Sequence, residues 1–139
     1  MNEHTIYLGG GCFWGLQGYI RKITGVLLTE VGYANGPTEN PSYEDVCHNS
    51  GHVEALKVTY DADTLSLDHL IQYFLRAIDP FSINKQGGDV GIQYRTGIYY
   101  TDKADKAIIE STLARAQAFE GKPFAIEVLP LENYYSAEE

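Results

Sequence analysis

The chain has 139 residues, 44 % of them hydrophobic, and a net charge of −9. This length and composition predict a single globular domain over residues 1–139 and exclude an intrinsically disordered chain. Because the sequence has no apolar run of membrane-spanning length, no basic cluster for nucleic acid and no signal peptide, we expect a cytoplasmic protein without membrane or nucleic-acid partners.

A strand, a glycine-rich turn and a helix are predicted near the N-terminus. An apolar run over residues 5–9 predicts the strand, and apolar side chains at helical spacing predict a helix over residues 13–23 that Gly25 ends. Cys12 follows three glycines and opens this helix. Unpaired backbone N–H groups and the positive end of the helix dipole favour a thiolate there, so we predict a reactive thiol with a lowered pKa.

Two further strands and a second helix follow, separated by a long polar segment. Strands are predicted over residues 26–33 and 52–60, and residues 34–51 between them form an expected loop rich in proline, glycine and asparagine. Ser66 is the expected N-cap of the second helix, because an apolar stripe at helical spacing begins directly after it. The same helix is expected to end at Asp79, which precedes a proline.

The last third of the chain contains a second irregular stretch, a strand, a helix and a final strand. Glycines make residues 81–93 irregular, and a strand is expected over residues 95–101. Asp102 is the expected cap of a helix that ends at Glu120, and residues 125–129 predict the final strand.

The order of these elements predicts the fold. The first six follow the strand-helix-strand-strand-helix-strand order of the split βαβ pattern. We therefore predict an α+β fold in two layers, a ferredoxin-like mixed sheet with helices packed on it. The two long irregular stretches are unusual in so small a domain, so we expect them to be active-site loops.

Glu54 is a candidate proton donor on the strand predicted over residues 52–60. Strand alternation places its side chain on the same face as Leu56 and Val58. A carboxyl group on an apolar face loses hydration, which raises its pKa and allows it to donate a proton near neutral pH. A glutamate that reaches water from the strand end is the alternative, and the residues alone leave both interpretations open.

Cysteine and histidine residues near the third strand offer a second interpretation. Cys47, His48 and His52 lie close together in the sequence and are possible metal ligands, but their spacing matches no common zinc pattern. We therefore expect no bound metal. A non-catalytic redox or metal sensor that uses these residues remains an alternative, as does a thiol peroxidase that relies on Cys12.

Four blocks of the sequence together resemble the A-type peptide methionine sulfoxide reductases. They are GGCFWG at residues 10–15, NPSYEDVC at 40–47, GHVEA at 51–55 and GGDVGIQYR at 87–95. The resemblance covers nearly the whole chain in the right order. It implies an enzyme that reduces the S epimer of methionine sulfoxide, free or within proteins, to methionine, with no metal or organic cofactor.

The resemblance also implies a role for each residue that matches the family motifs. Cys12 would attack the sulfoxide sulfur and become a sulfenic acid, and Glu54 would protonate the sulfoxide oxygen. Hydrogen bonds from two phenol groups would hold that oxygen, and one carboxylate would organise polar groups and water beside the site. An aromatic pocket would bind the S-methyl group. The two phenol groups belong to Tyr43 and Tyr94, the carboxylate belongs to Asp89, and the aromatic pocket is formed by Phe13 and Trp14.

Regeneration of the thiol is the step where this chain departs from many family members. Resolving cysteines in a C-terminal tail are common in the family, whereas Cys47 is the only cysteine here besides Cys12. Three explanations are open: the chain is shortened at its C-terminus, it is one domain of a longer protein such as a fusion to a B-type reductase, or it uses one cysteine. The resemblance implies that an external thiol then recycles the enzyme, which would be thioredoxin, glutaredoxin or the fused B-type reductase domain. A disulfide between Cys12 and Cys47 is the less favoured alternative, because the sequence does not show the short separation that it requires. We expect a monomer.

Overall fold

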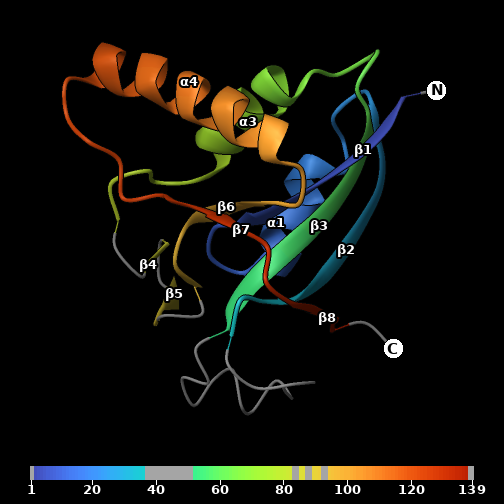
Figure 1. Ribbon diagram of the computed structural model, residues 1–139. Coiled ribbons are helices and arrows are strands. Elements are labelled where there is room, and N and C mark those ends of the chain that lie inside the picture. Colours follow the sequence, from blue (N-terminus) through green and yellow to red (C-terminus); the bar gives the residue numbers. More distant parts are fainter. Residues whose placement is uncertain (1, 37–51, 83–84, 87–88, 92–93, 138–139) are drawn as a thin grey trace.

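The computed structural model describes residues 2–36, 52–82, 85–86, 89–91 and 94–137. A six-stranded sheet in the order β7-β6-β1-β3-β2-β8 forms its centre (Figure 1). The strands of that sheet are β1 (Glu3–Gly9), β2 (Val26–Ala34), β3 (Val53–Asp61), β6 (Gly97–Tyr100), β7 (Glu127–Pro130) and β8 (Tyr134–Ser136). A second, two-stranded sheet joins β4 (Lys85–Gln86) and β5 (Asp89–Val90), and the described helices are α1 (Phe13–Ile20), α3 (Leu67–Ala77) and α4 (Lys103–Glu120).

The centre of the sheet has the predicted split βαβ topology. β3 lies antiparallel between β1 and β2, and β6 pairs with the other edge of β1, also antiparallel. β7 extends the sheet beyond β6 in a parallel arrangement, which makes the sheet mixed. The predicted α+β class, with a ferredoxin-like mixed sheet, is therefore confirmed.

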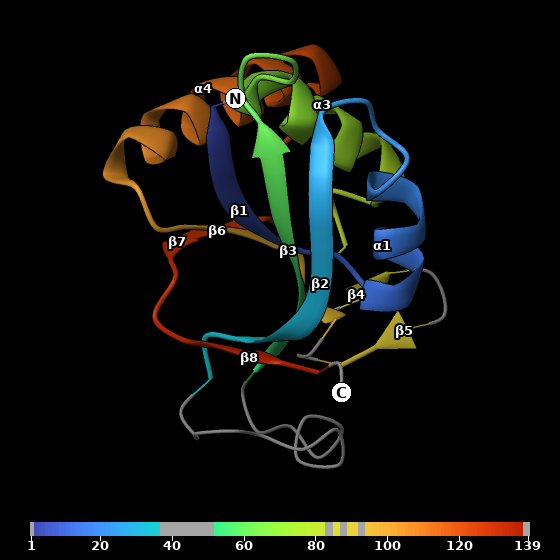
Figure 2. The same cartoon turned by 90° about the vertical axis from the view of Figure 1, so that its right-hand side faces the viewer.

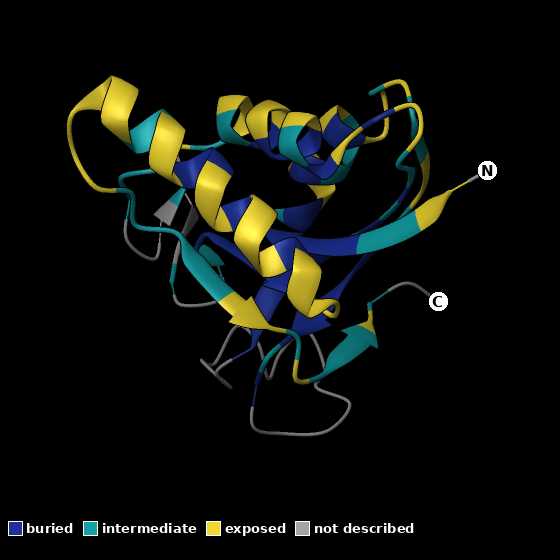
Figure 3. Ribbon diagram, turned by 45° about the horizontal axis from the view of Figure 1, so that its top comes forward, coloured by how far each residue is buried: buried dark blue, intermediate teal, exposed yellow. Residues whose placement is uncertain are grey.

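The helices α1, α3 and α4 pack on one face of the sheet (Figures 1 and 2). Their inward side chains share one core with the central strands, and their outer surfaces are exposed (Figure 3). The helical part of this core comprises Phe13, Leu16, Ile20, Leu67, Leu70, Ile71, Phe74, Ile109 and Leu113. The apolar stripes at helical spacing thus point inward, as such a pattern predicts.

The other face of the sheet is covered in part by the chain's C-terminal segment. A smaller buried cluster lies there, and Leu131 and Tyr134 pack against it. β8 continues this cover by pairing antiparallel with the end of β2. The sequence did not predict β8, because a three-residue strand is too short for an alternating pattern to stand out.

Two helices begin at their predicted caps. The Ser66 hydroxyl oxygen accepts the N–H of His69 at 3.1 Å, and Asp102 Oδ1 accepts the N–H of Ala104 at 2.9 Å. Each bond satisfies a donor that the first helical turn would otherwise leave without a partner. Gly121 then ends α4 in the left-handed conformation, with a φ of 78°.

α1 is shorter than predicted. The helix ends at Ile20, and its continuation tightens, because the N–H of Ile23 bonds to the carbonyl of Ile20 at 3.0 Å. This three-residue bond replaces the four-residue bond of an α-helix. Two strands also differ from their predicted bounds by a few residues. The strand predicted over residues 95–101 is β6 (Gly97–Tyr100), and the strand predicted over residues 125–129 is β7 (Glu127–Pro130). The stretch predicted to be irregular contains the short strands β4 and β5.

Candidate active site

Cys12 lies at the N-cap position of α1, directly after a sharp turn. Its own backbone is extended, with φ −65° and ψ 121°, and its carbonyl accepts the N–H of Leu16 at 3.2 Å, which begins the helix. Gly11 makes the turn with a φ of 76°, and a Cβ atom there would lie 2.7 Å from Cβ of Gln86. Glycine is therefore required at this position, and the half-buried thiol is placed at the start of the helix.

Glu54 lies next to the same turn, at the beginning of β3. Its side chain is 2 % exposed, and Oε1 accepts the backbone N–H of Phe13 at 3.2 Å. Tyr33 is its cross-strand neighbour on β2 and is also buried. The expected burial of Glu54 is confirmed, and the alternative of a carboxylate reaching water from the strand end is wrong. One hydrogen bond thus connects this carboxyl group to the residue that follows Cys12.

Aromatic side chains cluster beside Cys12. The Phe13 ring is 3 % exposed and lies between Trp14 and Tyr33, with ring-centroid distances of 5.5 Å and 5.6 Å. The Trp14 side chain is 56 % exposed and meets Phe13 edge-on. The two aromatics predicted for substrate binding therefore form one apolar surface, buried at Phe13 and open to solvent at Trp14.

A hollow of about 370 Å³ opens at Cys12, and we call it the Cys12 hollow. It lies between the start of α1, the end of α3 and strand β4. Among the described residues that line it, Arg76 is the single charged side chain and none is a carboxylate. The lining residues are Gly10, Gly11, Cys12, Gly15, Leu16, Tyr19, Arg76, Ala77 and Gln86.

Gln86 supports the wall of this hollow, and its role was not predicted from the sequence. Its Nε2 group donates to the carbonyl of Asp79 at 2.7 Å and to the hydroxyl oxygen of Thr96 at 3.0 Å. Its Oε1 atom accepts the N–H of Asp79 at 2.7 Å. These bonds use both amide hydrogens and fix the side chain against Gly11. The only sequence signal was a polar residue within a glycine-rich stretch.

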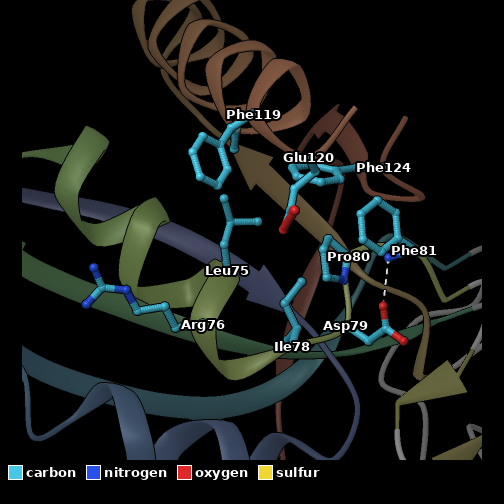
Figure 4. A pocket seen from close by; sticks show the side chains of 10 residues that line it. Leu75, Arg76, Ile78, Asp79, Pro80, Phe81, Phe119, Glu120 and Phe124 are labelled. Atoms are coloured by element: carbon cyan, nitrogen blue, oxygen red, sulfur yellow. Dashed lines mark hydrogen bonds between the residues drawn. The ribbon is translucent and has the colours of Figure 1, made fainter. Parts of the chain in front are cut away.

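The turn after α3 holds the partners of Gln86 in place. Asp79 accepts the N–H of Phe81 at 3.0 Å, drawn as a dashed line in Figure 4, and the hydroxyl of Ser82 at 2.8 Å. These donors, the Phe81 N–H foremost, hold the pKa of Asp79 below its usual value. Lys122 lies 4.1 Å from the centroid of the Phe81 ring. The carboxylate of Asp79 thus stabilises the backbone conformation that Gln86 binds.

The remaining residues predicted for the site lie near Cys12 only in part. The Tyr94 carbonyl accepts the N–H of Gly11 at 3.4 Å, so this residue borders the turn. Asp89 belongs to β5 and pairs with Gln86 through the backbone. Tyr43 lies outside the described residues, and its predicted contact with the sulfoxide oxygen stays a prediction.

The residues of the alternative metal site are mostly beyond the described ranges. Cys47 and His48 lie outside them, while His52 is fully buried with its ring 6.1 Å from that of Tyr135. Within the described parts of the chain, no group of three or more histidine, cysteine or acidic side chains could hold a metal ion. No described helix is both long and apolar enough to span a bilayer.

Comparison with known sequences gives a match over almost the entire chain. The model of the family described as "Peptide methionine sulfoxide reductase" matches residues 4–139. A relative from Lachnoclostridium phytofermentans, described as "Peptide methionine sulfoxide reductase MsrA", is 54 % identical over 140 residues, which cover 100 % of this chain and 84 % of the relative.

Solved structures share the fold. Mxr1 from Saccharomyces cerevisiae in reduced form is similar with a TM-score of 0.93 and 34 % identity, over 99 % of this chain and 81 % of Mxr1. A structure of Mxr1 in complex with Trx2 is similar with a TM-score of 0.75 and 26 % identity, over 99 % of this chain and 82 % of that chain.

Proposed function

This chain belongs to the peptide methionine sulfoxide reductase family and reduces methionine-(S)-sulfoxide to methionine, and we propose that Cys12 is the nucleophile of that reaction. One observation carries the proposal. The buried carboxyl group of Glu54 accepts the N–H of Phe13, the residue after Cys12, so that the carboxyl group lies at the helix start where Cys12 is the N-cap residue. Nucleophile and proton donor are the two groups that sulfoxide reduction requires.

The proposed reaction transfers one oxygen atom. The Cys12 sulfur attacks the sulfoxide sulfur, and Glu54 protonates the sulfoxide oxygen, which is otherwise a poor leaving group. The sulfur–oxygen bond of the substrate then breaks, and the oxygen bonds to the Cys12 sulfur as a hydroxyl group. The bond between the two sulfurs breaks in turn, and methionine leaves as the thioether. In sum, a thiol and a sulfoxide become a sulfenic acid and a thioether, so the cysteine is oxidised as the methionine is reduced.

The other predicted residues complete this proposal. Tyr43 and Tyr94 polarise the sulfoxide oxygen by hydrogen bonds, and Asp89 organises polar groups beside it. The S-methyl group binds on the aromatic surface of Phe13 and Trp14, which would accept a methyl group more readily than a charged group. The hydrogen bond from the Phe13 N–H to the Glu54 carboxyl group supports this assignment, because the proposed methyl-binding residue and the proposed proton donor are in contact.

Recycling of the sulfenic acid requires a reducing thiol. We propose thioredoxin, supported by the likeness to Mxr1 in complex with Trx2; glutaredoxin or a fused B-type reductase domain could supply the same thiol chemistry. The proposal also includes a monomer that acts in the cytoplasm as one catalytic domain over residues 1–139, with no metal or organic cofactor.

A single turnover without added reductant tests the nucleophile. Reduced protein is mixed with racemic methionine sulfoxide, methionine released per chain is quantified, and the protein is weighed intact. We expect one methionine per chain and a mass gain of one oxygen, and no methionine from Cys12→Ser. Release by the serine variant would refute Cys12 as the nucleophile. A mass loss of two hydrogens would instead identify Cys47 as a resolving cysteine.

A further inference from the structure

A groove runs from the Cys12 hollow along the interface of α1 and α3. The Cys12 hollow shares Arg76 with a hollow of about 220 Å³ on α3, and it shares Tyr19 with a third hollow of about 490 Å³. The second and third hollows share His69 and Tyr73. The three hollows therefore adjoin one another along the two helices, and we call them together the α1–α3 groove. α1 and α3 lie side by side in Figure 2.

The charge of this groove is opposite to that of the protein. The chain carries 19 acidic residues against 10 lysines and arginines, yet the described lining of all three hollows includes no aspartate or glutamate. Among the described lining residues, Lys22 and Arg76 are the charged side chains, and His69 is the one histidine. Like charges in a concave surface concentrate the potential there, so the groove attracts anions that the rest of the protein repels.

The Arg76 side chain is oriented for such a role. Its guanidinium carbon lies 5.6 Å from the centroid of the Tyr73 ring, which is part of the groove wall. Arg76 also lines the neighbouring hollow, which contains Asp79 and Glu120, but Figure 4 shows the Arg76 side chain directed away from the aromatics of that hollow, Phe81, Phe119 and Phe124. A guanidinium stacked on an aromatic ring keeps its N–H donors available for a carboxylate.

We propose that the α1–α3 groove binds the peptide segment around a methionine sulfoxide and favours segments with carboxylates near the oxidised residue. This inference rests on the proposed function, because the sulfoxide must lie at Cys12. Arg76 borders that point, and His69 lies two helical turns away, about 10 Å along α3. An extended peptide covers that distance in about three residues. Carboxylates about one and four residues from the sulfoxide would therefore meet Arg76 and then Lys22 with His69.

Peptide pairs test this specificity in single turnovers. Each blocked peptide carries a central methionine sulfoxide with aspartates about one and four residues away, on one side or the other, and its partner carries asparagines. At an ionic strength of about 0.02 M we expect kcat/KM to favour the acidic peptide about three- to tenfold, the effect of two exposed ion pairs. The preference should vanish at about 0.5 M salt. A wild-type ratio near one in both series would refute the proposal.

Two charge-matched double variants locate the effect. Lys22→Gln/Arg76→Gln should abolish the preference, and Lys103→Gln/Lys106→Gln, which removes two charges from α4, should keep it. The ratio of the two peptides cancels any general effect on chemistry. The proposal is wrong if both variants change the ratio equally, or if neither does.

Two further outcomes distinguish a peptide groove from a reductant-binding groove and from a protein that does not reduce sulfoxides. If the groove variant leaves the peptide ratio intact but slows recycling by thioredoxin and not by dithiothreitol, the groove binds the reductant and the peptide proposal is wrong. If wild-type protein releases no methionine from either peptide, the proposed function itself fails. Turnover of the asparagine peptide with a ratio near one contradicts the groove alone.

Discussion

The Glu54 carboxyl group serves two purposes that one substitution can separate. Its Oε1 atom fixes the N–H of Phe13, and its acidic proton is proposed to reach the sulfoxide oxygen. Glutamine keeps the shape and a carbonyl oxygen that can accept the same N–H, but it has no acidic proton. Glu54→Gln therefore preserves the geometry of the helix start and removes only the proposed chemistry.

We expect Glu54→Gln to slow methionine release by about 10²- to 10⁴-fold, the usual contribution of a general acid. Alkylation of Cys12 by iodoacetamide needs no proton donor and should change little. Rapid-quench single turnovers and the alkylation rate measure the two effects, with Glu110→Gln on the exposed surface of α4 as the control. Equal losses in both assays would mean that Glu54 only positions the turn.

Sequence patterns predicted some site residues and missed others for identifiable reasons. A glycine turn before a helix was enough to place Cys12, whereas alternation along one strand offered burial of Glu54 as one of two interpretations, and the structure decides for burial. Gln86 could not be predicted, because its partners Asp79 and Thr96 come from different segments that only the fold brings together. Tyr43 stays a prediction, since it lies outside the described residues.

At the scale of elements, the turn before α1 meets β4 through a contact that leaves no room for a side chain. Gly11 has a φ of 76°, and its missing Cβ would lie 2.7 Å from Cβ of Gln86. Gly121 at the end of α4 has nearly the same φ, 78°, but no heavy atom within 4 Å of a built Cβ. The two glycines thus differ in packing and share the same backbone conformation.

Alanine at each glycine separates these effects. Gly121→Ala should lower the free energy of unfolding by about 1 kcal/mol, the cost of a left-handed residue with a side chain. Gly11→Ala adds a steric overlap with Gln86 and should cost about 2–4 kcal/mol in total, with slower methionine release. Urea unfolding at neutral pH measures both changes. Equal losses of stability would show that Gln86 moves aside and does not brace the turn.

Elements with local signals were predicted better than elements that depend on distant partners. Ser66 and Asp102 each cap their helix through a bond within the same turn, so a short sequence window contained the information. β8 exists because it pairs with β2, one hundred residues earlier for Tyr134 against Ala34, and no local pattern indicates such a contact. The pairing of β4 with β5 is local, since Gln86 faces Asp89, but each strand has only two residues, too few for an alternating pattern to stand out.

At the scale of the whole molecule, the net charge of −9 makes every carboxylate a source of repulsion, but local surroundings divide the carboxylates into two classes. Burial, followed by the nearby charge of Asp102, raises the pKa of Asp105. The hydroxyl of Thr112, together with Arg115, lowers the pKa of Asp68. Removal of the carboxylate changes the net charge of the protein by the same amount at either site. Any difference between the two variants in the free energy of unfolding therefore comes from the local environment of the carboxylate.

Asparagine substitutions at these sites should change stability in opposite directions at pH 7. A raised folded-state pKa means that ionisation of Asp105 costs stability as pH rises through it, so Asp105→Asn should gain about 1 kcal/mol or less, and the gain should vanish below about pH 3.9. A lowered pKa means that ionised Asp68 stabilises the fold, so Asp68→Asn should lose about 1 kcal/mol, a loss that shrinks as pH falls through the folded-state pKa. Urea unfolding across this pH range measures both. Gains of equal size at the two sites would mean that overall repulsion, and not the local partners, governs the pH dependence of stability.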